Sequence, residues 1–216
     1  MDKLSLYDLL SILLPGSLLS LFLVMLFNDF GYDLDGFELN DYFWLTIYLS
    51  SSFFLGSTIN ILTRSILGFK LYQKFGLYTP IHEIYEKASH NNQLKPFYDS
   101  FDIPQGDKMS HQERSGYIWD EIYYDLEATD KISVPKSFQS FYFFFRNFFT
   151  LGLFLLLPTI ALGLAHWFTA KYIILFIIIL FAMGISVFAA SWNRKMMVSR
   201  MYWTYYSLHK NNSNGK

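Results

Sequence analysis

Four long apolar segments dominate the pattern of hydrophobic and polar positions along the chain. They cover residues 9–27, 43–62, 148–168 and 172–192, and none of them contains a charged residue. A helix that crosses a bilayer needs roughly 20 mostly apolar residues, because the hydrocarbon core is about 30 Å thick and each residue rises about 1.5 Å. The pattern therefore predicts an all-α integral membrane protein with four transmembrane helices, arranged as two helical hairpins.

The first apolar segment must be distinguished from a cleaved signal peptide. Lys3 is the single basic residue before it, Asp2 and Asp8 oppose that charge, and no small-residue cleavage site follows Phe27. The apolar stretch is also longer than the core of a signal peptide. We therefore expect a retained transmembrane helix, kinked near Pro15.

Basic residues gather on one side of the predicted spans. The loop 28–42 contains five acidic residues and neither Lys nor Arg. The segment between the second and third spans and the tail after the fourth carry the basic residues Arg64, Lys70, Lys74, Lys131, Lys136, Arg146, Arg194, Lys195, Arg200 and Lys210. Because Lys and Arg are concentrated in cytoplasmic loops, we expect a multi-pass protein of the inner (cytoplasmic) membrane with both termini in the cytoplasm.

The spans divide the chain into four predicted parts. These are a first transmembrane hairpin (1–62), a cytoplasmic helical insert (63–147), a second transmembrane hairpin (148–192) and a basic, aromatic cytoplasmic tail (193–216). Within the insert, Thr79 followed by Pro80 predicts the start of a helix, and Ser110 with Glu113 has the spacing of a capping box. We expect two helices that begin at these positions, and no strands.

Composition narrows the possible functions. Hydrophobic residues make up 52% of the chain, aromatic residues 20% and charged residues 16%, and the formal net charge is -1. An average soluble protein has about 25% charged residues. These values argue against a soluble enzyme, a disordered tail, a coiled coil and a conventional nucleic-acid binder. The chain has no Cys, which excludes disulfides, Cys-based metal sites and thiol catalysis.

The second span carries a stripe of mostly polar residues on one helical face. Its members are spaced by four, three, four, three and four positions, and they are Thr46, Ser50, Phe53, Ser57, Asn60 and Arg64. One interpretation is that the stripe lines a water-filled path in an oligomer, with Phe53 as a hydrophobic constriction. The other is helix packing, since small and hydroxyl residues such as Ser52 and Gly56 let helices approach closely. Both interpretations remain open at this point.

Cations beside aromatic rings mark two further candidate sites. Arg146 lies within the aromatic run 141–149, where it either anchors the helix at the interface or serves gating or ligand binding. The tail presents a second set, consisting of Arg194, Lys195, Arg200, Tyr202 and Trp203. These residues are typical of a juxtamembrane helix in contact with anionic lipid, and alternatively of a site that stacks a nucleotide or a single nucleic-acid strand.

Evidence for metal binding or catalysis is weak. His82, Glu86 and His90 recur every four residues, but three positions on one helix face span about 12 Å, too far for a single ion. No Ser/His/Asp arrangement, Walker loop or dinucleotide fingerprint is present. We expect no metal, no cofactor and no enzymatic activity.

Several features together resemble small prokaryotic membrane proteins encoded in antiphage defence systems. They are the four spans, the insert, the opening Leu6-Tyr7-Asp8-Leu9-Leu10, the motif Leu13-Leu14-Pro15-Gly16, and Arg200-Met201-Tyr202 in the tail. Two such proteins are the channel effector of the Hailong system and the membrane subunit of the Kiwa system. The resemblance covers the whole architecture and includes no catalytic motif.

The two resemblances imply different functions. The Hailong-like case implies a homotetrameric, aromatic-lined channel that is held shut by a nucleic-acid oligomer made by a partner nucleotidyltransferase. The Kiwa-like case implies a non-conducting membrane sensor that recruits a soluble, cytoplasmic, DNA-binding defence partner. We expect an oligomeric ion-channel-type effector of antiphage defence and abortive infection, gated at the cytoplasmic face by a nucleotide, a nucleic acid or a partner. The alternative is a non-conducting scaffold or sensor.

Overall fold

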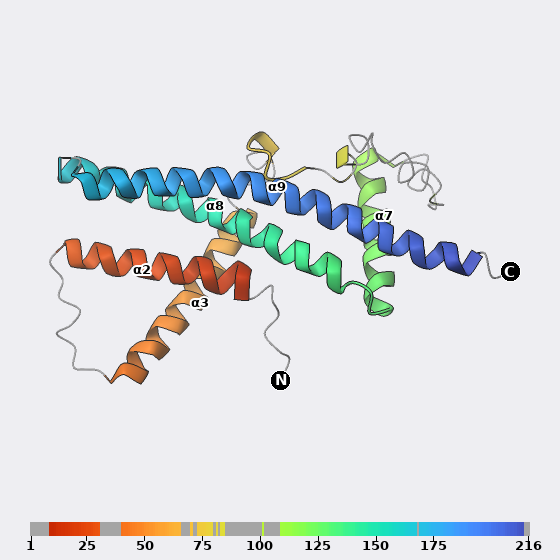
Figure 1. Ribbon diagram of the computed structural model, residues 1–216, viewed down its shortest axis with the longest axis horizontal. Coiled ribbons are helices and arrows are strands. Elements are labelled where there is room, and N and C mark those ends of the chain that lie inside the picture. The colour runs from red at the N-terminus through yellow and green to blue at the C-terminus, as the bar shows by residue number, and fades with distance from the viewer. Residues whose placement is uncertain are drawn as a thin grey trace. The chain divides into compact units, whose positions relative to one another are not determined.

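The computed structural model describes residues 9–30, 40–65, 70, 73–79, 81, 83–84, 101, 109–167 and 169–213 (Figure 1). The described residues contain helices and no strand. The elements in chain order are a π-helix η1 (Leu9–Leu13), α2 (Leu14–Asp29), α3 (Asp41–Ser65), α7 (His111–Ala128), α8 (Ser133–Ala165) and α9 (Ala170–Ser213).

Four helical segments are long and apolar enough to cross a membrane. They are Ser11–Asp29, Asp41–Ser65, Ser133–Ala165 and Ala170–His209. The prediction of an all-α protein with four transmembrane helices is therefore confirmed. Many large apolar side chains on these helices are exposed, Phe181 for example to 71%, which is the condition expected of a surface that meets lipid rather than water.

The chain forms two compact units. One consists of Met1–Leu77 and Ser140–Ala190, and the other of Tyr78–Gln139 and Ser191–Lys216. Both α8 and α9 contribute residues to each unit. We call the first the membrane unit, because it holds most of the apolar stretches, and the second the α7 unit.

Within the membrane unit, η1 and α2 both approach α3 backbone to backbone. A Cβ added to Gly16 would lie 1.7 Å from the carbonyl oxygen of Ser52, and one added to Gly56 would lie 1.9 Å from that of Ile12. No side chain larger than hydrogen fits at these two positions. The glycines therefore permit the tight crossing, as small residues commonly do between membrane helices.

Other contacts join the remaining helices of the membrane unit. Gly152 of α8 makes room for Met183 of α9, whose Cγ would lie 2.3 Å from an added Cβ. The hydroxyl of Thr63 on α3 donates a hydrogen bond to that of Thr150 on α8 over 2.9 Å, and both residues are buried. Such hydroxyl pairs hold membrane helices together where apolar contact alone does not distinguish protein from lipid.

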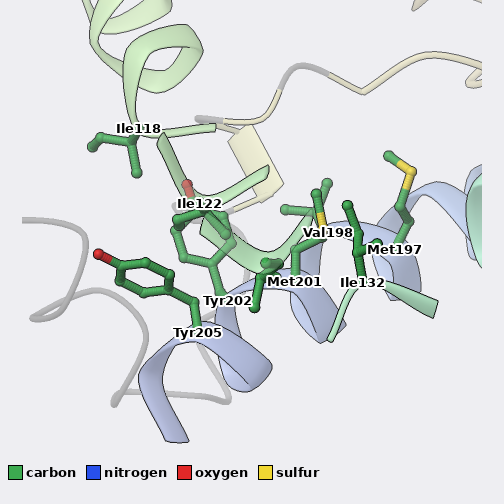
Figure 2. Close-up of a cluster of buried hydrophobic side chains, with 9 residues drawn as sticks. Ile118, Ile122, Ile132, Met197, Val198, Met201, Tyr202 and Tyr205 are labelled. Atoms are coloured by element: carbon green, nitrogen blue, oxygen red, sulfur yellow. The ribbon is translucent and has the colours of Figure 1, made fainter. Parts of the chain in front are cut away.

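The α7 unit has an apolar core of its own. Ile118, Ile122 and Leu126 lie on one face of α7 and are fully buried against Val198 and Tyr202 of α9 (Figure 2). The predicted capping box is confirmed, since the Ser110 hydroxyl accepts the backbone N–H of Glu113 while the Glu113 carboxylate accepts that of Ser110. Most of the helix predicted from Thr79 lies outside the described residues.

Candidate functional site

The face of α3 that packs inside the chain differs from the predicted polar stripe. Ser52, Gly56, Ile59 and Thr63 are the buried residues of α3. The stripe positions 53, 57, 60 and 64 each come one residue after a buried position. One residue of an α-helix corresponds to a rotation of about 100°, so the stripe is rotated by that angle from the packing face. The packing interpretation therefore accounts for Ser52 and Gly56, whereas Thr46, Ser50 and Phe53 of the stripe are exposed on the single chain.

The first half of the stripe is exposed on the single chain. Thr46 and Ser50 are exposed, and Phe53 is exposed to 49%. The Thr46 hydroxyl donates to the carbonyl oxygen of Tyr42 over 2.8 Å, which lowers the cost of placing that hydroxyl in an apolar medium. Ser57 is half-buried, and Arg64 at the end of the stripe is exposed.

Asn60, the fifth stripe residue, enters a polar cluster that connects three helices. Its Oδ1 accepts hydrogen bonds from Nη2 of Arg146 and from Nδ2 of Asn147, both over 3.2 Å. Asn147 Nδ2 also donates to the carbonyl oxygen of Ser11 over 2.7 Å. The Asn60–Arg146–Asn147 cluster therefore links η1, α3 and α8 at one end of the membrane unit.

Arg146 is enclosed by the helices and the aromatic rings around it. Arg146 is only 8% exposed. The guanidinium carbon lies 4.5 Å from the ring centroid of Phe143 and 5.8 Å from that of Tyr142. Cation–π contacts of this kind and charge-assisted hydrogen bonds offset part of the cost of burying a cation in an apolar region.

A second polar group joins the helices at the other end of the membrane unit. Lys171 Nζ lies 2.6 Å from Oδ1 of Asp29, and the Tyr172 hydroxyl donates to Oδ2 of Asp29 over 3.1 Å. The ring of His166 stacks on Tyr172 with centroids 5.2 Å apart. These contacts tie the end of α2 to the start of α9.

The predicted basic and aromatic tail is divided between buried and accessible residues. Arg194 is 8% exposed, its Nε donates to the carbonyl oxygen of Thr79 over 2.8 Å, and its guanidinium carbon lies 4.3 Å from the ring centroid of Tyr78. Tyr202 belongs to the core of the α7 unit. A separate group remains accessible, with Lys195 and Arg200 exposed and Trp203 half-buried.

The sequence interpretation did not single out Asn147, Ser11 or the hydroxyl pair Thr63–Thr150. One available signal was that Asn147 is a second polar residue within the aromatic run 141–149. The proposed His82, Glu86 and His90 positions lie outside the described residues. Among the residues that are described, no group of three His, Cys, Asp or Glu side chains is placed to hold a metal ion.

Comparison of the chain with protein-family models, with curated proteins and with solved structures gave no match. The resemblance to antiphage defence proteins stays a prediction.

Proposed function

We propose that the chain is a subunit of an oligomeric, channel-type membrane effector, and that the exposed stripe on α3 lines its water-filled path. The observation that carries this proposal is the position of Thr46, Ser50 and Phe53, which the packing inside the chain leaves exposed. Polar faces of transmembrane helices ordinarily face a protein interior or a cavity. Copies of the chain around an axis would supply that interior, and the resemblance favours four of them.

The proposed gate combines the stripe with the cluster around Arg146. Phe53 supplies a hydrophobic constriction that closes the path by excluding water. Asn60 belongs both to the stripe and to the cluster, so a rearrangement around Arg146 would move α3 directly. Asn147 Oδ1 is buried and has no hydrogen-bond partner among the described residues, so it can accept a hydrogen bond from a donor that a rearrangement brings close.

The proposed signal arrives at the cytoplasmic face. The distribution of Lys and Arg supports an inner-membrane protein with cytoplasmic termini. Lys195, Arg200 and Trp203 are the accessible members of the tail, and they suit a nucleotide, a single nucleic-acid strand or anionic lipid. A role in antiphage defence rests on the resemblance alone.

Cysteine accessibility tests the pore directly, because the natural chain has no Cys. We expect a membrane-impermeant, cationic thiol reagent to modify the Ser50→Cys variant in liposomes. The matched control is Phe181→Cys, the twelfth residue of α9 as Ser50 is the tenth of α3. Phe181 is exposed to 71%, and we expect it to remain unmodified because it faces hydrocarbon. Mass spectrometry detects the reaction whether or not ions flow.

Opening the constriction supplies a second measurement that needs no ligand. We expect Phe53→Ala to raise ion flux across the liposome membrane. In the double variant Phe53→Ala and Ser50→Cys, we expect modification of the cysteine to reduce this flux. Equal reactivity of the Ser50 and Phe181 positions, together with no flux from Phe53→Ala, would overturn the proposal.

The α7 unit supports a second candidate, a scaffold that binds a soluble partner. Its core is formed by α7 and the later part of α9 (Figure 2). Tyr117 and Tyr124 are exposed on α7 to 43% and 67%, and exposed tyrosines are common in binding surfaces. We expect the double variant Tyr117→Ala and Tyr124→Ala to lose a defence partner in pull-downs while keeping the Tm of the wild type. Unchanged capture by the double variant would exclude this surface.

A further inference from the structure

The outer face of α7 carries a regular stripe of acidic residues and tyrosines, which we call the α7 stripe. Its members are spaced by four, three, four and three positions, so they share one side of the helix. All five are exposed, and they are Glu113, Tyr117, Asp120, Tyr124 and Glu127. Tyr124, for example, comes two positions after the buried Ile122, which corresponds to about 200° around the helix. The α7 stripe therefore points away from the core that α7 shares with α9 (Figure 2).

The part of α9 in the same unit has the opposite charge. Residues 191–216 contain five basic and no acidic residues, whereas residues 78–139 contain eleven acidic and six basic ones. Lys195 and Arg200 are exposed on α9, and Arg200, Trp203 and Ser207 follow one another at spacings of three and four. Trp203 and Ser207 each lie two positions from the buried Tyr205. This basic face of α9 therefore also points away from the shared core.

The two charged faces do not pair with each other inside one chain. Glu127, at one end of the α7 stripe, pairs with Lys136 of α8 over 2.8 Å. Asp120, Lys195 and Arg200 form no ion pair within the part of the chain that the structure describes. Because both faces are turned away from the core between the helices, a chain cannot bring its own Asp120 to its own Arg200 without unpacking that core. These charges are available to another molecule.

We propose that the α7 stripe of one copy binds the basic face of α9 of a neighbouring copy, with Asp120 facing Arg200. The two surfaces differ, so the contact is heterologous, and its repetition around an axis closes a ring of α7 units. An anionic signal that binds Lys195 and Arg200 would compete with this contact. The inference rests on the proposed oligomer but not on conduction, so a linked oligomer without ion flux would contradict the pore alone.

A second copy suits the α7 stripe better than an unrelated basic protein does. Insertion in the membrane gives all copies the same orientation, so their α7 units lie on the same side and meet at a high effective concentration. The chemistry also matches, since tyrosine rings attract Arg and Lys while a neighbouring carboxylate accepts their hydrogen bonds. Tyr117 and Tyr124 flank Asp120 on the stripe in this way. Tyr and Arg are both enriched in protein interfaces.

Cross-linking between two kinds of copy tests the contact, because the natural chain has no Cys. Copies with Tyr124→Cys and copies with Ser207→Cys are produced together in one membrane and treated with a short bis-maleimide. We expect linked dimers from the mixture and not from either variant alone, since a heterologous contact does not bring a residue to its own counterpart. The matched control replaces Tyr124→Cys with Val134→Cys, which lies in the same unit, outside the stripe, and is exposed to 54%. It should remain unlinked.

Charge reversal tests the chemistry of the same contact. Asp120→Arg in the Tyr124→Cys copies should lower the yield of linked dimers at least about threefold, because attraction at an exposed pair becomes repulsion. Adding Arg200→Asp to the Ser207→Cys copies should restore the yield, which a merely structural defect would not allow. Equal yields in the three mixtures, dimers of Tyr124→Cys copies alone, or links from Tyr124→Cys to a soluble basic protein in place of the second copy would overturn the proposal.

Discussion

Replacing Gly56 with alanine tests the backbone contact between η1 and α3. The added Cβ would lie 1.9 Å from the carbonyl oxygen of Ile12, whereas ordinary contact begins at 3.4 Å, so the helices must separate by about 1.5 Å. Overpacking of this kind costs about 1–3 kcal/mol or more, and alanine recovers up to about 1 kcal/mol of helix propensity. Because the obstructing atom belongs to the backbone, we expect a net loss of about 2 kcal/mol.

Gly184 supplies the control for this prediction. It lies in α9, and a Cβ there would meet no atom within 4 Å, so Gly184→Ala should leave stability unchanged or raise it by up to about 1 kcal/mol. Thermal unfolding in detergent, followed by tryptophan fluorescence, measures both variants. For a chain of this size, 2 kcal/mol corresponds to a Tm lower by about 4–8 °C. If the Tm of Gly56→Ala equals or exceeds that of Gly184→Ala, the backbone crossing is not as described.

Three further predictions concern polar contacts. Asn147→Leu removes the hydrogen bonds that Asn147 Nδ2 donates to the Ser11 carbonyl over 2.7 Å and to Asn60 Oδ1 over 3.2 Å, and should cost about 1–3 kcal/mol because each such bond contributes about 0.5–1.5 kcal/mol; an unchanged Tm would contradict this. A double-mutant cycle of Asp29→Asn and Lys171→Met should give a coupling of about 0.2–1 kcal/mol for this partly exposed pair, decreasing with salt, and a salt-independent value would argue against direct pairing. Hydrogen bonds from the backbone N–H and the hydroxyl of Ser110 lower the pKa of Glu113 below its ordinary value of 4.5, so the cap stabilises α7 above pH 4.5 and is lost as the pH falls through the lowered pKa. Hydrogen exchange of α7 should show this loss in the wild type and not in Glu113→Gln.

The spans and the fold class could be predicted because the bilayer restricts what a chain can do. Every backbone polar group inside hydrocarbon needs an internal partner, so an uncharged apolar stretch such as 172–192 has few alternatives to a helix. The capping box at Ser110 and Glu113 could be predicted equally well, since its two residues are three positions apart and recognising it requires no knowledge of tertiary structure.

The polar cluster could not be predicted in the same way. Asn147 contacts the carbonyl oxygen of Ser11 across 136 positions of the chain, and no periodicity reports which helices meet. A charged residue within an aromatic run marked Arg146 as a candidate site residue. Its sequence context did not indicate that Asn60 would accept its hydrogen bond. For α3, small-residue spacing correctly indicated that Ser52 and Gly56 can pack closely, while the exposure of the stripe needed coordinates.

The π-helical turn at Leu9–Leu13 makes the start of the first span sensitive to chain length. Its i→i+5 hydrogen bonds accommodate one more residue per turn than the i→i+4 bonds of an α-helix. Deletion of one residue within this turn would restore the α-helical spacing and so change the direction in which the Ser11 carbonyl, inside the turn, points relative to Asn147. A single-codon deletion would thus disconnect the beginning of the chain from α8, although the hydropathy of the span would hardly change.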